Sequence, residues 1–118
     1  MPLLQLKTNT GNIPESVKTE IQKMSSLILS EEIGKSQEFV MILFETDHSI
    51  YFSGSTEPSA YGEIKNVGTL IPEVTKKISH RLSMLLEDKL SIPTHRCFLE
   101  FQESSRHLWG WKGKTFAS

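Results

Sequence analysis

The sequence predicts an α+β fold, with one mixed four-stranded sheet, two antiparallel helices on one of its faces and short extra strands. The chain has 118 residues, of which 37% are hydrophobic, so a single domain over residues 1–118 can bury a modest core. A strand-helix-strand pattern occurs twice, over about residues 2–58 and 59–118. Both helices open with the same tripeptide, Ile-Pro-Glu, at Ile13 and Ile71. Two such units side by side give a split, ferredoxin-like arrangement.

The first unit starts with a strand and a helix. Residues 2–8 are apolar with partial alternation, which is typical of a strand. Pro14 suits the first helical turn, where its missing N–H costs little, and Gly34 suits the end of a helix. Between them, apolar residues recur at steps of three and four, which predicts a buried stripe formed by Val17, Ile21, Met24 and Ile28.

Two further strands of the first unit are predicted from apolar residues between turns. Residues 39–44 are continuously apolar, which is typical of a strand buried on both faces. A turn at residues 46–49 then leads into a second short strand, expected over residues 50–53. Another turn, at residues 54–58, closes the unit.

The second unit repeats this order. Residues 60–67 predict a strand that Gly68 ends, and residues 97–101 predict the matching strand. Between these strands we expect a helix that ends at Ser91. Its expected apolar stripe consists of Ile71, Val74, Ile78, Leu82 and Leu85. The tail over residues 108–116 is unusually aromatic for a chain end.

A sheet with helices on one face leaves its other face uncovered. The apolar side chains of the strands cannot all point toward the helices, and the residues concerned include Leu3, Met41, Leu43 and Phe98. An exposed apolar surface of this size usually marks an interface. The sequence therefore predicts an oligomer.

Composition excludes several classes of protein. The formal net charge is −1, so no strong field is available to hold a nucleic-acid backbone. Cys97 is the single cysteine and cannot form an intramolecular disulfide. No apolar run approaches the ~20 residues of a membrane span, and the start of the chain lacks the pattern of a signal peptide. The four histidines show no metal-ligand spacing. We expect a soluble, cytoplasmic protein without metal or cofactor that binds neither nucleic acid nor membrane.

Pro2 is the residue with the most informative chemistry. A small second residue permits removal of Met1, and Pro2 would then carry a free secondary amine in place of an amide. A free α-amino group has a reference pKa of about 7.7–8.0, which burial and a nearby cation both lower. A neutral amine near pH 7 is a competent general base. The alternative is that Pro2 only permits processing and starts a strand.

A set of short motifs, in order along the whole chain, resembles the macrophage migration inhibitory factor family of the tautomerase superfamily. The set comprises Pro2-Leu3-Leu4, Thr8-Asn9, Gly34-Lys35, residues 52–58, Asn66-Val67-Gly68, Trp109-Gly110-Trp111 and Thr115-Phe116-Ala117. The resemblance implies a homotrimer of repeated strand-helix-strand units. It also implies a cofactor-free isomerase that acts on keto or enol acids of the phenylpyruvate or dopachrome type.

The resemblance also implies roles for individual residues. Pro2 matches the catalytic base, and Lys35 matches the lysine that binds the substrate carboxylate or carbonyl. Asn66 and Val67 match a pair whose backbone N–H groups help to hold the acidic end of the substrate. The apolar wall and mouth of the pocket match Phe39, Trp109, Trp111 and Phe116, and a neighbouring subunit would contribute Phe98 and Glu100.

Two residues depart from the pattern of the animal members. Phe98 stands in place of a Tyr and lacks its hydroxyl, and Glu100 stands in place of an Asn. A carboxylate near a site for anionic substrates would repel them and could raise the pKa of Pro2. The resemblance also leaves a second function open, since animal members act as leaderless, secreted cytokines on protein receptors. The same trimeric fold could serve as a non-catalytic interaction protein.

Overall fold

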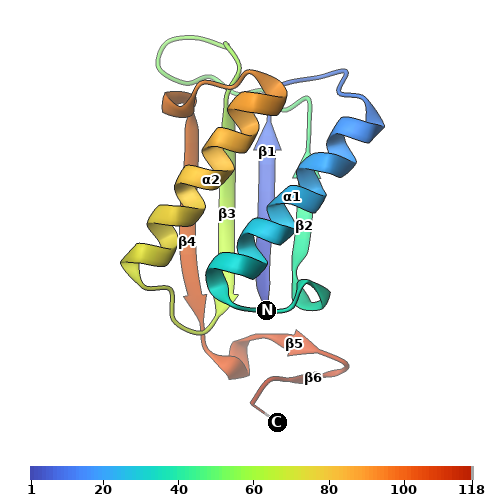
Figure 1. Cartoon of the computed structure of the whole chain (residues 1–118), viewed down its shortest axis with the longest axis vertical. Helices are drawn as coiled ribbons and strands as arrows, with labels where there is room; N and C mark the ends of the chain where they lie inside the picture. Colours follow the sequence, from blue (N-terminus) through green and yellow to red (C-terminus); the bar gives the residue numbers. More distant parts are fainter. Residues whose placement is uncertain (118) are drawn as a thin grey trace.

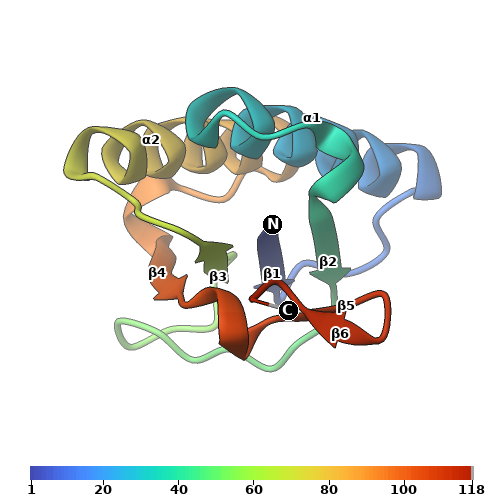
Figure 2. The same cartoon turned by 90° about the horizontal axis from the view of Figure 1, so that it is seen from below.

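A mixed sheet with two helices on one face makes up most of the molecule in the computed structural model, which describes residues 1–117 (Figures 1 and 2). The sheet has the strand order β2-β1-β3-β4. Its strands are β1 (Pro2–Thr8), β2 (Met41–Glu45), β3 (Ala60–Val67) and β4 (Cys97–Ser104). The helices are α1 (Glu15–Ile33) and α2 (Pro72–Leu90). Short 3-10 helices η1 (Gln37–Phe39), η2 (Thr94–Arg96) and η3 (Arg106–Leu108) and the hairpin β5 (Gly110–Trp111) and β6 (Lys114–Thr115) complete the structure.

The predicted repeat of two strand-helix-strand units is confirmed. The order β1-α1-β2 forms one unit and β3-α2-β4 the other, and the strands within each unit pair in parallel. The units join through antiparallel pairing of β1 with β3, with Pro2 opposite Asn66 and Thr8 opposite Ala60. Each helix is 19 residues long and crosses back over its own pair of strands (Figure 1).

The core lies between the sheet and the helices. In β1 every second side chain is buried, and Leu4 and Leu6 meet Ile64 of β3 on the helix-facing side. Burying a Leu or Ile side chain contributes about 1.5–3 kcal/mol, so this alternation sets which face of each strand carries the helices. The helices supply Ile21, Ile28, Leu29, Ile78, Leu82, Leu85 and Leu86.

Most of the predicted helical stripes are buried, with local exceptions. Met24 is exposed and Ser25 is buried instead, because the interface of α1 with the sheet and α2 runs through Ile21, Ser25 and Ile28. Ile71 is exposed because it precedes α2 as the residue at its N-cap. Gly34 ends α1 with φ +79°, the left-handed conformation that glycine adopts without strain.

The prediction that residues 39–44 form a strand buried on both faces was wrong. Phe39 belongs to η1, and β2 begins only at Met41. The side chains of Met41 and Leu43 are 61% and 43% exposed. The reason is that both helices lie on one face of the sheet, so no element of residues 1–117 covers the other face, on which Met41 and Leu43 lie. A continuous apolar run cannot distinguish these two situations.

The expected strand over residues 50–53 is also absent, and β4 is longer than the predicted 97–101. In place of that strand, the described residues have one isolated antiparallel β-bridge, between Phe52 and Ser55. This loop is held by Arg96, which is 7% exposed and donates from Nε to the carbonyl of Pro58 at 2.9 Å. Its Nη1 donates to the backbone carbonyl of Phe52 at 3.0 Å, and its Nη2 donates to the backbone carbonyls of Ser55 and Glu57 at 3.4 and 3.1 Å. A buried guanidinium therefore replaces the hydrogen bonds of a strand ladder.

The face of the sheet opposite the helices is mixed in chemistry. Leu3, Met41, Leu43 and Phe98 do lie on it, and Phe98 is 60% exposed. Polar side chains alternate with them across the strands, so that Gln5 lies between Leu43 and Glu63, and Glu63 lies beside Glu100.

Among the described helices, none is long and apolar enough to cross a membrane.

We predict that this face is covered in a homotrimer. Exposed Met, Leu and Phe side chains on an edge strand and its neighbours are stabilised when a second copy removes them from water. Sedimentation equilibrium at micromolar concentration is expected to give three times the mass of the chain. A monomer mass across the whole concentration range contradicts the prediction.

Candidate functional site

The topology brings four strand ends together at one end of the sheet. Since β1 and β2 run in parallel, both begin there, and β3 and β4 both end there. The C-terminal end of α1 and the tail after β4 reach the same place (Figures 1 and 2). Residues far apart in the sequence, including Pro2, Lys35 and Val67, are thereby gathered at one edge.

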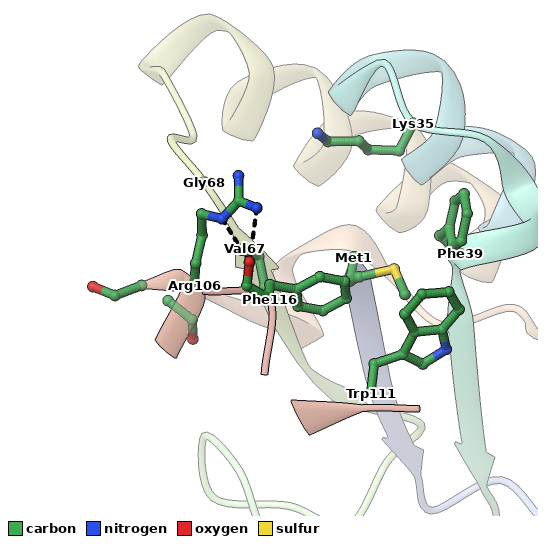
Figure 3. A pocket seen from close by; sticks show the side chains of 10 residues that line it. Met1, Lys35, Phe39, Val67, Gly68, Arg106, Trp111 and Phe116 are labelled. Carbon is green, nitrogen blue, oxygen red and sulfur yellow. Dashed lines mark hydrogen bonds between the residues drawn. The ribbon is translucent and has the colours of Figure 1, made fainter. Parts of the chain in front are cut away.

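A cavity of about 640 Å³ lies at this end of the molecule (Figure 3). Pockets for small molecules typically measure about 300–1,000 Å³. The chain start contributes Met1, and the segment after α1 contributes Lys35 and Phe39. The ends of β3 and β4 and the aromatic tail supply the rest of its lining: Val67, Gly68, Ser104, Ser105, Arg106, Trp111 and Phe116.

Pro2 is buried, next to the half-buried Met1. A smaller adjoining cavity of about 240 Å³ is lined by Met1 and Pro2 together with Trp109 and Trp111. While Met1 is present, the nitrogen of Pro2 belongs to a peptide bond and has no basicity. Removal of Met1 would put a free secondary amine in the lining of the smaller cavity, which shares Met1, Phe39 and Trp111 with the larger one.

The environment at the chain start lowers the pKa of an amine. The pKa of the Met1 amine lies below its usual value, first because burial disfavours the charged form and second because the Lys35 ammonium repels it. Since Pro2 is the next residue and is itself buried, we expect the same two causes to act on an amine at Pro2. They are the two causes that sequence reasoning expected for an amine on Pro2.

Lys35 is held in position by the end of α1. The left-handed Gly34 turns the chain, and the Lys35 N–H then donates to the Ser30 carbonyl at 3.1 Å. The hydroxyl of Ser30 in turn donates to the carbonyl of Lys35. In residues 1–117, no carboxylate is paired with the Lys35 ammonium, so its charge is available to the cavity.

Asn66 and Val67 have different places at the end of β3. Val67 lines the cavity, whereas Asn66 is buried beside it, opposite Pro2 in the sheet. Within residues 1–117, Asn66 Oδ1 has no hydrogen-bond partner. The N–H of the next residue, Gly68, already donates to the Ser104 carbonyl at 3.3 Å. The Gly68 N–H therefore points toward β4, and the N–H of Val67, the preceding residue, points to the other side, toward the start of β1.

An aromatic wall closes one side of the cavity. Trp111 stacks on Phe116, with ring centroids 5.8 Å apart and an angle of 14° between the planes. Phe39 meets Trp111 edge to face at 5.8 Å and 82°. Trp109 lines only the smaller cavity next to Pro2. These four sequence-predicted residues thus lie together, and the wall can hold a planar or apolar carbon skeleton.

Phe98 and Glu100 do not line the cavities of their own chain. Both lie on the sheet face opposite the helices, where Phe98 meets Phe52 edge to face at 4.9 Å and Glu100 lies beside Glu63. Within one chain the structure does not bring them to Pro2. A role in the site would require a neighbouring copy, and this stays a prediction.

Sequence reasoning missed Arg106, which lines the cavity opposite Lys35 (Figure 3). Its Nε and Nη2 donate to the carbonyl of Phe116 at 3.0 and 2.7 Å. Its position in the sequence could have indicated this role, because Arg106 lies two residues after β4 and β4 ends where β1 begins.

Over the described residues 1–117, no cluster of three or more His, Cys, Asp or Glu could hold a metal ion.

Known proteins with similar sequences share the whole length of this chain. The family model for macrophage migration inhibitory factor (MIF) matches residues 1–117. A macrophage migration inhibitory factor homolog of Brugia malayi is 31% identical over 98% of this chain and 99% of its own. The macrophage migration inhibitory factor of Xenopus laevis is 26% identical over 99% of this chain and 100% of its own.

Solved structures agree with this match. A macrophage migration inhibitory factor-like protein from Entamoeba histolytica superposes with a TM-score of 0.90 at 31% identity, covering 98% of each chain. A homologue from Prochlorococcus marinus superposes with a TM-score of 0.88 at 32% identity, covering 97% of this chain and 98% of its own. The chain therefore belongs to the macrophage migration inhibitory factor family.

Proposed function

We propose that the protein, once Met1 is removed, is a cofactor-free keto-enol tautomerase in which Pro2 is the general base. The observation that supports this most strongly is the buried chain start beside Lys35, where burial and the ammonium lower the pKa of an amine. A base with a pKa near the working pH contributes typically 10²–10⁴-fold to proton transfer. No further group is needed for the chemistry.

The proposed reaction moves one proton. The neutral Pro2 nitrogen takes a proton from the carbon next to the carbonyl of a 2-oxo acid, and the electron pair of that C–H bond forms the C=C bond of the enolate. The protonated Pro2 nitrogen then gives this proton to the enolate oxygen, which yields the enol and restores the neutral amine, and the reverse sequence converts enol to ketone. Lys35 and the backbone N–H of Val67 hold the carboxylate end, which positions the carbon next to the carbonyl beside the base.

The aromatic wall has a second role in this proposal. Trp111, Phe116 and Phe39 exclude water from the base. Less water disfavours the charged amine and strengthens its repulsion by the Lys35 ammonium, and both effects keep the amine partly neutral. Their rings also offer a stacking surface to an aryl pyruvate. An aryl pyruvate such as phenylpyruvate is therefore a suitable first substrate.

Protein binding without catalysis is the second candidate function. It is favoured by the names of the relatives, which describe a factor that inhibits macrophage migration. The assay of phenylpyruvate turnover by protein that begins at Pro2 separates the two candidates. Absence of turnover supports the binding role and contradicts the enzymatic proposal.

Pro2 is expected to be the residue that an electrophilic substrate analogue modifies. Bromopyruvate carries a carboxylate for Lys35 and an alkylating carbon for the neutral amine. Incubation of the processed protein should add one pyruvyl group, and peptide mapping by mass spectrometry should place it on Pro2. Labelling at Cys97 alone, or no labelling at all, contradicts the role of Pro2 as a base.

Lys35 and Glu100 are expected to have opposite effects on an anionic substrate. Lys35→Ala should raise KM for phenylpyruvate about tenfold, or ~1.4 kcal/mol, because it removes attraction to the carboxylate. Glu100→Asn should raise kcat/KM, because it removes repulsion contributed by a neighbouring copy. Steady-state kinetics of both variants measure these changes. If Glu100→Asn has no effect while Lys35→Ala lowers kcat/KM, Glu100 points away from the substrate.

A further inference from the structure

The cavity has a second cation that the proposed reaction does not use. One carboxylate of a 2-oxo acid needs one positive partner, and Lys35 fills that role. Arg106 lies on another side of the same cavity, as Figure 3 shows, and comes from η3 rather than from the α1 end. The lining described above contains these two cations and no acidic residue.

The guanidinium of Arg106 is held in place and still has donors to offer. Nε and Nη2 both donate to the Phe116 carbonyl, which fixes the guanidinium against the base of the aromatic wall. Nη1 makes no hydrogen bond to the described residues 1–117, and none of their carboxylates pairs with Arg106. An arginine held at two of its nitrogens loses little further freedom when its remaining N–H groups bind a carboxylate or phosphate.

The rings of Trp111 and Phe116 form another side of the cavity, next to the head groups of Lys35 and Arg106 (Figure 3). The carbonyl of Phe116 accepts a hydrogen bond from Arg106, and the ring of Phe116 stacks on Trp111. Arg106 is therefore attached to the aromatic wall on which the carbon skeleton of a substrate would lie. A ligand lying on these rings can present one acidic group to Lys35 and a second one to Arg106. Arg106 is exposed, so water can bind its free N–H groups in the empty pocket, and an apolar tail that displaces this water without replacing its hydrogen bonds loses affinity.

We propose that the pocket selects a doubly anionic 2-oxo acid, with Lys35 on the 2-oxo carboxylate and Arg106 on a second acidic group. This inference rests on the proposed function for the reacting end of the substrate, and Arg106 is then the residue that determines specificity at the other end. Singly charged aryl pyruvates fill the same wall but leave Arg106 unused. They are therefore expected to be poorer substrates than their acidic analogues.

The test compares a matched pair of substrates and a matched pair of unreactive ligands. The substrates are phenylpyruvate and 4-carboxyphenylpyruvate, and the ligands, measured by calorimetry, are benzoate and terephthalate. Protein beginning at Pro2 should favour the doubly charged member of each pair by about tenfold. In Arg106→Gln this preference ratio should fall close to one, whereas Lys114→Gln removes the same charge from the adjacent hairpin and should keep it.

The outcomes separate the inference from the proposed function. A preference for terephthalate that disappears in Arg106→Gln, without turnover of either pyruvate, supports the second acid site and contradicts the tautomerase. Turnover of both pyruvates at equal kcat/KM contradicts the second acid site and leaves the tautomerase in place. Equal loss of the preference in Arg106→Gln and Lys114→Gln also overturns the inference, since a general field would then explain it. The ratio in Arg106→Lys provides a further check, because a point charge should restore only part of the preference.

Discussion

A chain that retains Met1 is expected to lose tautomerase activity almost completely. The nitrogen of Pro2 is then an amide, which cannot accept the substrate proton, and Met1 itself lines both cavities beside Pro2. Since a placed general base contributes typically 10²–10⁴-fold, kcat/KM for phenylpyruvate should fall by at least about 100-fold. Kinetics of two preparations that differ only in Met1, each verified by intact mass, measure the effect.

Two controls make this result specific. Thermal unfolding of both preparations should give similar midpoints, because Met1 is only partly buried and lies outside the strand pairs. In the processed form, Pro2→Gly keeps an α-amine at the same place and should keep part of the activity, since a base remains within reach of the substrate. Equal activity with and without Met1 shows that Pro2 is not the base.

Arg96→Met is expected to destabilise the fold by about 2–4 kcal/mol. The buried guanidinium donates to four carbonyl groups of residues 52–58 and lies 5.2 Å from the centroid of the Phe52 ring. Hydrogen bonds to a charged group contribute about 1.5–3 kcal/mol each, and they are not additive when they share one donor group. Differential scanning calorimetry at equal protein concentration should show a midpoint lower by about 10 °C.

Arg81 provides the matched control for this prediction. Its guanidinium pairs with Glu31 and Glu32 at 2.9 Å each, but its side chain is 34% exposed. Exposed ion pairs contribute about 1 kcal/mol or less, so Arg81→Met should cost much less than Arg96→Met. Equal losses in the two variants contradict the view that burial makes Arg96 the anchor of this loop.

The sequence by itself was sufficient to locate the helices and most strands. The start of α2 at Pro72 and the end of α1 at Gly34 depend on backbone limits of single residues, and the helical stripes depend on a local period. Such signals act within a few residues and can be read without a partner. The resemblance of short motifs added the candidate residues Pro2 and Lys35, and the structure places both at one end of the sheet.

Only the tertiary structure decided the features that depend on distant residues. The order β2-β1-β3-β4 makes β2 an edge strand, a position that its continuous apolar pattern does not contain. Arg96 replaces an expected strand because its guanidinium reaches carbonyls about 40 residues away. Arg106 enters the cavity because the parallel pairing of β3 and β4 carries the end of β4 to the start of β1. Contacts between residues far apart in the chain decide these features, and no local pattern contains that information.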